Sequence, residues 1–65
     1  MNLKEYLYTN YIDPMTFAVS VDISLSAVYR YMRGGRPHLK TALRIERATK
    51  GKVTAKDLRG DHAEG

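Results

Sequence analysis

Cysteine and tryptophan are both missing from this chain of 65 residues. Without cysteine, neither a disulfide framework nor a cysteine-ligated zinc site can stabilise the fold, and the lack of cysteine fits a reducing compartment. A chain of this length makes one domain with a small core and marginal stability. We therefore expect helix packing, or a partner subunit, to supply the stability that cross-links would otherwise give.

Long apolar runs are missing as well. No stretch approaches the ~20 apolar residues of a membrane-spanning helix. Residues 1–5 also lack the charged-then-apolar pattern of a signal peptide. We expect a soluble, cytoplasmic protein with no membrane partner.

Patterns typical of enzymes and metal sites are scarce. His38 and His62 have no metal-ligand spacing around them, and no serine belongs to an obvious set with a histidine and a carboxylate. Gly34-Gly35 follows no predicted strand, as the phosphate loop of a nucleotide-binding protein would. We expect no catalytic residues, no metal, no cofactor and no small-molecule substrate.

Negative charge is scarce in the middle of the chain. The formal net charge is +4, but residues 30–56 contain nine Lys and Arg against Glu46 alone, and the segments on either side are each net negative. A concentrated positive segment is typical of proteins that bind a polyanion. A solvated basic face, which is common in small domains, is the alternative interpretation.

Residues 14–33 predict two short helices, about Pro14–Val21 and about Leu25–Met32, joined by a tight turn. Asp13 before Pro14 is a strong start signal, and Ser24 can cap the second helix. The core-facing residues are Phe17, Ala18 and Val21 on the first helix, Ile23 in the turn, and Val28 and Tyr31 on the second. Asp22 tolerates the left-handed conformation that the turn requires, and small Ala18 lets the helices approach closely. This arrangement is a helix-turn-helix, whose second helix can enter the major groove of DNA.

Three further helices are expected. The first follows an Asn2 cap with Glu5 three residues later, places Leu3, Tyr6 and Leu7 on the core, and ends near Thr9-Asn10. Tyr8 and Tyr11, near that end, can bury their rings and keep their hydroxyls in water. After Gly34-Gly35 and a loop, a helix of about Leu39–Thr49 turns Ala42, Ile45 and Thr49 inward and Lys40, Arg44, Arg47 and Lys50 outward; Gly51 ends it. A short helix from Ala55, capped by Thr54 and Asp57, brings Leu58 to the core beside Val53. We expect no strand, and a disordered tail over residues 60–65.

Over residues 13–59 the chain resembles the Cro/CI-type phage repressor family. The resemblance rests on Ala18, Val21, Ile23, Val28 and Tyr31, and downstream on Arg33-Gly34, Pro37, residues 41–49, Gly51, Val53-Thr54 and Asp57-Leu58. It departs from the family at Asp22, where glycine often stands. The resemblance implies an all-α, λ-repressor-like bundle of about five short helices, with residues 1–59 as a helix-turn-helix DNA-binding domain. It also implies a Cro-like regulator, DNA-associated in the cytoplasm of a bacterial or phage-infected cell, that binds operator DNA as a homodimer.

The second helix of the motif supplies the candidate base contacts, because a helix in the major groove presents its first turn to base edges. These candidates are Ser24, Leu25, Ser26, Tyr29 and Arg30. Leu25 can contact a thymine methyl group, and the guanidinium fork of Arg30 matches the two acceptors of guanine. Arg30 could instead contact a phosphate or pair with Glu46.

The candidate phosphate contacts follow directly in the chain: Arg33, Arg36, His38, Lys40 and Thr41. In this architecture the loop before the fourth helix, and the N–H groups at the start of that helix, point towards the DNA backbone. We expect the later basic residues to be solvated instead.

Three questions stay open from the sequence. The homodimer contact could use residues 50–54, the last helix, or Met15 and Val19, and could form only on DNA. Met15 and Val19 could also be simply exposed, or could meet the first helix. The rivals to an operator-binding regulator are a protein-interaction module of antitoxin or anti-repressor type and an architectural DNA binder.

Overall fold

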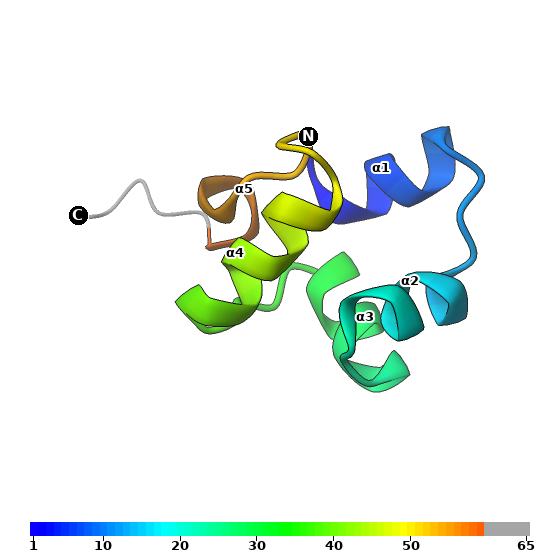
Figure 1. Cartoon of the computed structure of the whole chain (residues 1–65), viewed down its shortest axis with the longest axis horizontal. Helices are drawn as coiled ribbons and strands as arrows, with labels where there is room; N and C mark the ends of the chain where they lie inside the picture. The colour runs from blue at the N-terminus through cyan, green and yellow to red at the C-terminus, as the bar shows by residue number, and fades with distance from the viewer. Residues whose placement is uncertain (60–65) are drawn as a thin grey trace.

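Five short α-helices are present in the computed structural model, which describes residues 1–59 (Figure 1). They are α1 (Leu3–Thr9), α2 (Pro14–Val21), α3 (Leu25–Met32), α4 (Leu39–Ala48) and α5 (Ala55–Arg59). No β-strand occurs in that range, so the prediction of an all-α domain of five short helices is confirmed. The predicted tail, residues 60–65, lies outside the described residues.

The helix starts are set by short polar side chains, as the sequence predicts. The Asn2 side chain accepts a hydrogen bond from the Glu5 N–H at 2.8 Å, and the Glu5 carboxylate accepts one from the Asn2 N–H. Asp13 caps α2 in the same way, with Pro14 at the first helical position. Such caps satisfy N–H groups that have no partner inside the helix.

The ends of α1 to α4 share one backbone design. In each, the N–H of one residue donates to the carbonyl five residues earlier: Ile12 to Leu7, Ile23 to Ala18, Gly35 to Arg30 and Gly51 to Glu46, at 2.8–3.0 Å. The residue just before each donor has a positive φ: Tyr11, Asp22, Gly34 and Lys50. These are Schellman motifs, which close a helix through one left-handed residue. The predicted left-handed Asp22 is therefore confirmed.

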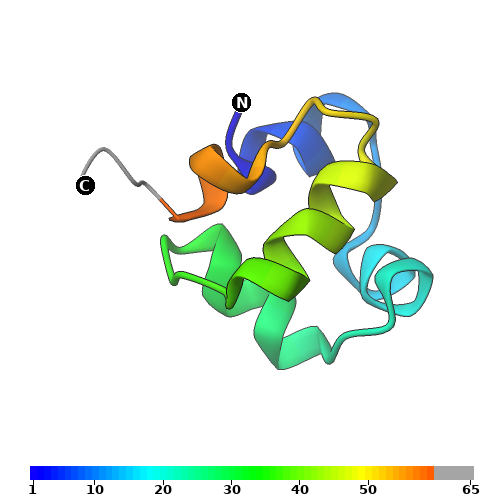
Figure 2. The same ribbon diagram turned by 60° about the vertical axis from the view of Figure 1, so that its left-hand side comes forward.

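Each helix contributes apolar side chains from one of its faces to the core. Its fully buried members come from all parts of the described chain: Leu3, Leu7, Phe17, Ala18, Val21, Val28, Ala42, Ile45, Val53 and Leu58. Tyr6 packs edge-on against Phe17 with ring centroids 6.4 Å apart, and Ile23 and Tyr31 are half-buried against the cluster. Figure 2 shows α4 crossing in front of the other helices, where its inner face closes the core.

Two predictions need correction. Tyr8 and Tyr11 do not bury their rings: their exposed fractions are 84% and 96%. Within residues 1–59 both side chains extend into solvent where the chain leaves α1 for α2. The fourth helix also ends one residue early, at Ala48, and buried Thr49 is its C-cap.

The structure answers the question that the sequence left open about the outer face of α2. Met15 and Val19, left undecided by the sequence, are exposed on the outer face of α2. Within residues 1–59, no helix is long and apolar enough to cross a membrane.

Candidate nucleic-acid interface

Helix α3 is held so that one side of its first two turns faces solvent. The Ser24 hydroxyl oxygen accepts the Ala27 N–H at 3.0 Å and so fixes the start of the helix. Val28 is fully buried one turn later, which fixes the rotation of α3 about its own axis. The residues on the opposite side must then point outward.

The five candidate base-contact residues occupy that outer side. Ser24, Ser26, Tyr29 and Arg30 are exposed, and Leu25 is half-buried at the edge of the domain. Together they form a short surface with two hydroxyl groups, one phenol, one aliphatic edge and one cation. Such a surface offers donors, acceptors and an apolar contact to a ligand that presents edges of bases.

Arg30 contacts Tyr31 and Gly35 and forms no ion pair within residues 1–59. Its guanidinium carbon lies 5.5 Å from the centroid of the Tyr31 ring, at cation–π distance. A Cβ added at Gly35 would lie only 2.7 Å from Arg30 Cγ and 2.9 Å from its carbonyl oxygen, so glycine is required for this close approach. The possible pair with Glu46 is not formed, and the Glu46 carboxylate accepts the Ala55 N–H at 2.8 Å.

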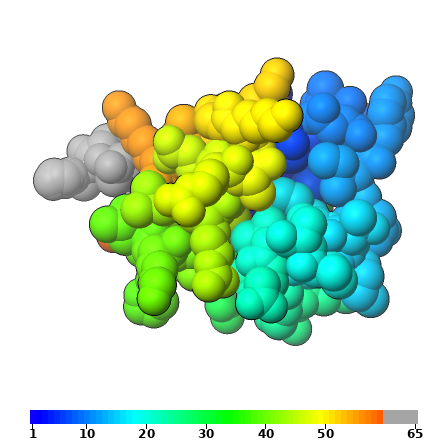
Figure 3. Space-filling model, in the orientation of Figure 1, coloured from blue at the N-terminus to red at the C-terminus, as the bar shows by residue number. Residues whose placement is uncertain are grey.

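The candidate phosphate contacts lie beside this surface, on the loop after α3 and the start of α4. Arg33, Arg36, His38 and Lys40 are exposed, and Thr41 is half-buried. Figures 1 and 2 both place the start of α4 next to α3. In the space-filling view the segment around residues 33–41, in green, forms the lower left edge of the molecule (Figure 3).

The start of α4 differs from those of the other helices. His38 occupies the N-cap position but its side chain makes no capping hydrogen bond. The other four helices are capped, α3 by Ser24 and α5 by Thr54, with Asn2 and Asp13 capping α1 and α2. The first N–H groups of α4 are therefore left for an external acceptor, and the helix dipole favours an anion there.

The basic residues of this region keep their charge available. Within residues 1–59 the one ion pair joins the Met1 ammonium group to Asp57, at 3.0 Å. None of the cations between residues 30 and 56 is neutralised by an acid in that part of the chain, so their field extends into solvent. A cluster of unpaired cations raises the local concentration of anionic ligands.

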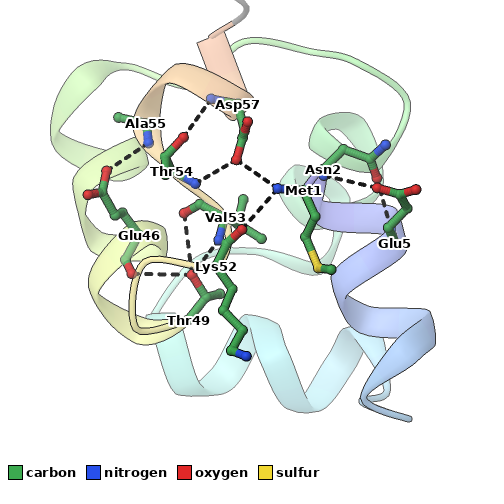
Figure 4. A network of polar contacts seen from close by, with 10 residues as sticks. All are labelled: Met1, Asn2, Glu5, Glu46, Thr49, Lys52, Val53, Thr54, Ala55 and Asp57. Carbon is green, nitrogen blue, oxygen red and sulfur yellow. Dashed lines mark hydrogen bonds and ion pairs between the residues drawn. The ribbon is translucent and has the colours of Figure 1, made fainter.

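Acidic groups take part in a hydrogen-bond network that joins the start of α1 to the segment from α4 to α5 (Figure 4). Asp57 Oδ2 accepts hydrogen bonds from the Thr54 N–H and from the Met1 ammonium group, both at 3.0 Å. The Thr54 N–H bond, with the ammonium group, lowers the pKa of the Asp57 carboxyl, although partial burial opposes this. The Met1 ammonium group also donates to the Lys52 carbonyl. This network ties the start of α1 to α5.

One basic residue escaped the sequence reasoning. Arg59, at the end of α5, lines a hollow of about 390 Å³ together with Arg33 and Arg36. Arg59 lies more than 20 positions after Arg33 and Arg36 in the chain, so no local pattern could have grouped it with them. The basic surface therefore extends from the loop after α3 towards α5.

Among the residues that the structure describes, no three His, Asp or Glu side chains gather closely enough to hold a metal ion. Comparison of the chain with protein-family models, with curated proteins and with solved structures finds no match.

Proposed function

We propose that the protein is a sequence-specific DNA-binding transcriptional regulator, a repressor of the Cro kind, in a λ-repressor-like fold. In this proposal α2 and α3 form a helix-turn-helix, and α3 enters the major groove. One observation carries the proposal. The exposed outer side of α3 lies beside an uncapped helix start and a run of cations that form no ion pair with an acid of residues 1–59.

Base reading falls to the first two turns of α3. Arg30 donates two hydrogen bonds to the O6 and N7 acceptors of a guanine, and Leu25 contacts a thymine methyl group. Ser24, Ser26 and Tyr29 supply weaker contacts, because a hydroxyl group both donates and accepts and discriminates little between bases. Much of the sequence preference therefore depends on Arg30.

Backbone binding sets the register of α3 in the groove. Arg33, Arg36 and Lys40 neutralise phosphates, and His38 and Thr41 supply further hydrogen bonds to the backbone. A phosphate at the start of α4 accepts the N–H groups that no side chain caps. Three neutralised phosphates per chain correspond to a salt slope of about −3, and twice that for a dimer.

The operator is expected to be two-fold symmetric. The resemblance implies a homodimer, and a dimer of this type places its recognition helices about one helical turn of DNA apart, ~34 Å. Activity as a repressor then follows from occupancy of a promoter and requires no catalytic chemistry.

The test begins with selection of bound fragments from a random DNA pool, followed by titration at several salt concentrations. We expect a symmetric consensus and an affinity that falls steeply with salt. A flat salt response would contradict binding through phosphates. Equal affinity for all fragments would favour an architectural DNA binder.

Three arginine variants separate the roles of the residues. Arg30→Ala should lose about 1–3 kcal/mol on the consensus and relax the preference at one position. Arg36→Ala should weaken all sequences alike and reduce the salt slope by about 1 per chain. Arg47→Ala is the matched control, an exposed arginine on α4 outside the proposed interface. If Arg30→Ala weakened every sequence equally, Arg30 would contact a phosphate and not a base.

A protein-interaction module of antitoxin or anti-repressor type is the second candidate. The exposed apolar side chains at the end of α1 and on α2 favour it. Failure of the selection to enrich any fragment, even at low salt, would support this candidate over the first.

A further inference from the structure

The four most exposed of the large apolar side chains within residues 1–59 all lie between positions 8 and 19, outside the candidate nucleic-acid interface. Tyr8 at the end of α1 and Tyr11 in the following loop are 84% and 96% exposed, and Met15 and Val19 on α2 are 54% and 74% exposed. Met15 and Val19 are four residues apart, so they lie on one face of α2. We call these four residues the tyrosine surface.

The fold does not require a tyrosine at position 11. The residue occupies the left-handed position of the Schellman motif that ends α1, with φ of 55°, where glycine or asparagine is favoured and a bulky side chain is strained. Its ring contributes no burial within the chain, since almost all of it is exposed. Neither the backbone nor the core therefore explains why an aromatic residue stands there.

A hollow lies directly beside this ring. It has a volume of about 680 Å³ and is lined by Leu7, Tyr8, Thr9, Tyr11, Ile12 and Asp13. Most of its lining surface is apolar. In Figures 1 and 3 the end of α1 and the start of α2 form the right-hand end of the molecule. The same small region thus offers both a projecting aromatic ring and a space that could accept one.

We propose that the tyrosine surface is the contact between two copies of this chain, related by a two-fold axis. The Tyr11 ring of each copy lies in the hollow of the other, so that the same patch serves both subunits, as a two-fold interface requires. Aromatic side chains with one wet end suit this position.

The available area fits a weak dimer. Two tyrosines bury roughly 300–500 Å² per copy, at 150–250 Å² for each aromatic side chain. Any burial of Met15 and Val19 adds to this area, which by itself is below the ~800 Å² per partner of a standard interface. We therefore expect dissociation in the micromolar range, because interfaces at this lower end of the size range are commonly transient.

The distribution of charge also favours self-association through the tyrosine surface over self-association through residues 30–56. Residues 30–56 contain nine cations and one acid, so two copies repel each other there. The tyrosine surface carries few charges, with Asp13 at the edge of the hollow. The two surfaces share no residue, and the dimer contact stands whether or not the protein binds DNA.

Sedimentation equilibrium of the full chain without DNA, from about 5 to 500 μM, tests the proposal over the expected micromolar range. We expect a monomer–dimer equilibrium in the wild type. Tyr11→Gly removes both central rings of the dimer and should weaken it by at least about 30-fold, the effect expected from the loss of one central aromatic residue. Because glycine is relaxed in the left-handed conformation, the melting temperature of the dilute variant should stay the same or rise.

Tyr8→Ser is a second variant, on the regular helix α1, and should also weaken the dimer. Leu39→Ser is the matched control, since Leu39 is 52% exposed but lies on α4, and it should leave the dimer unchanged. A monomeric wild type over the whole range would overturn the proposal and leave the surface for a different protein. A dimer that tolerates Tyr11→Gly, or that Leu39→Ser weakens equally, would overturn it too.

A drop in the melting temperature of dilute Tyr11→Gly would show that the ring supports the fold and not the pair, which also overturns the proposal. Failure of the regulator proposal is distinguishable. A monomer that binds operator DNA contradicts only the contact proposed here, and a dimer that selects no DNA contradicts only the regulator.

Discussion

The buried hydroxyl group of Thr49 offers a sharp test of how α4 is joined to α5. Thr49 is 1% exposed, and its Oγ accepts the N–H of Val53, itself fully buried, at 3.0 Å. The same hydroxyl can donate to the Glu46 carbonyl at 3.2 Å or to the Val53 carbonyl at 3.3 Å. Thr49→Val keeps the side-chain shape but removes the hydroxyl group, and so leaves the Val53 N–H buried without a partner.

The expected cost follows from that single unpaired group. A buried donor that loses its acceptor costs about 1–3 kcal/mol, which is a large fraction of the roughly 3–10 kcal/mol expected for 65 residues. The melting temperature should fall by about 4–8 °C for each kcal/mol lost. Thr49→Ser retains the hydroxyl group and loses one buried methyl group, worth about 0.8 kcal/mol.

Thermal and urea unfolding followed by far-UV circular dichroism would measure both variants. We expect Thr49→Val to be less stable than Thr49→Ser, and both to be less stable than the wild type. The reverse order, or a Thr49→Val protein as stable as the wild type, would show that packing, not the hydrogen bond to Val53, holds this turn.

Two further predictions concern the supports of the candidate interface. Ala18→Leu should destabilise the domain by about 1–3 kcal/mol, because Ala18 is buried in the core and extra volume there forces neighbours apart; exposed Thr16→Leu on the same helix is the control, and equal melting temperatures for the two variants would contradict the reasoning. Asp57→Asn should lower stability at neutral pH and flatten its acid dependence. The hydrogen bond from the Thr54 N–H holds the folded pKa of Asp57 below the ordinary value of an aspartate, so the carboxylate stabilises the fold above that ordinary value, and this contribution is lost as the pH falls through the folded pKa. Urea unfolding from neutral to acidic pH would measure this, and an unchanged acid limb in Asp57→Asn would refute it.

The helix starts were predictable because their causes are local. An N-cap and its partner lie within three residues of each other, as Asn2 with Glu5 and Thr54 with Asp57 do, so the sequence displays both groups together. The buried faces of α2, α3 and α4 followed from helical spacing for the same reason.

Contacts between distant segments could not be predicted in this way. The Met1 ammonium group donates a hydrogen bond to Asp57, 56 positions further along the chain. The Glu46 carboxylate accepts a hydrogen bond from the Ala55 N–H and does not pair with Arg30. Helical spacing shows which face is apolar but not whether another element covers it. Tyr8 and Tyr11 are the clearest case, since the chain leaves them in solvent.

The candidate interface was partly visible in the sequence. The run of cations and the outward side of α3 follow from composition and spacing. The missing cap at His38 and the approach of Gly35 to Arg30 needed the geometry, because a histidine before a helix can be a cap or not, and a pair of glycines marks only a helix end.

The four Schellman motifs show what in this chain specifies the end of a helix. Only α3 has glycine at the left-handed position; the others have Tyr11, Asp22 and Lys50. The residues that follow the first two of these, Ile12 and Ile23, are half-buried against the core, which is the apolar contact that accompanies this motif. Burial of an isoleucine, worth ~1.5–3 kcal/mol when complete, can offset the ~1–2 kcal/mol of a strained left-handed residue. The turn between α2 and α3 is therefore held by Ile23 more than by Asp22, and the position of α3 depends on the core and not on a glycine.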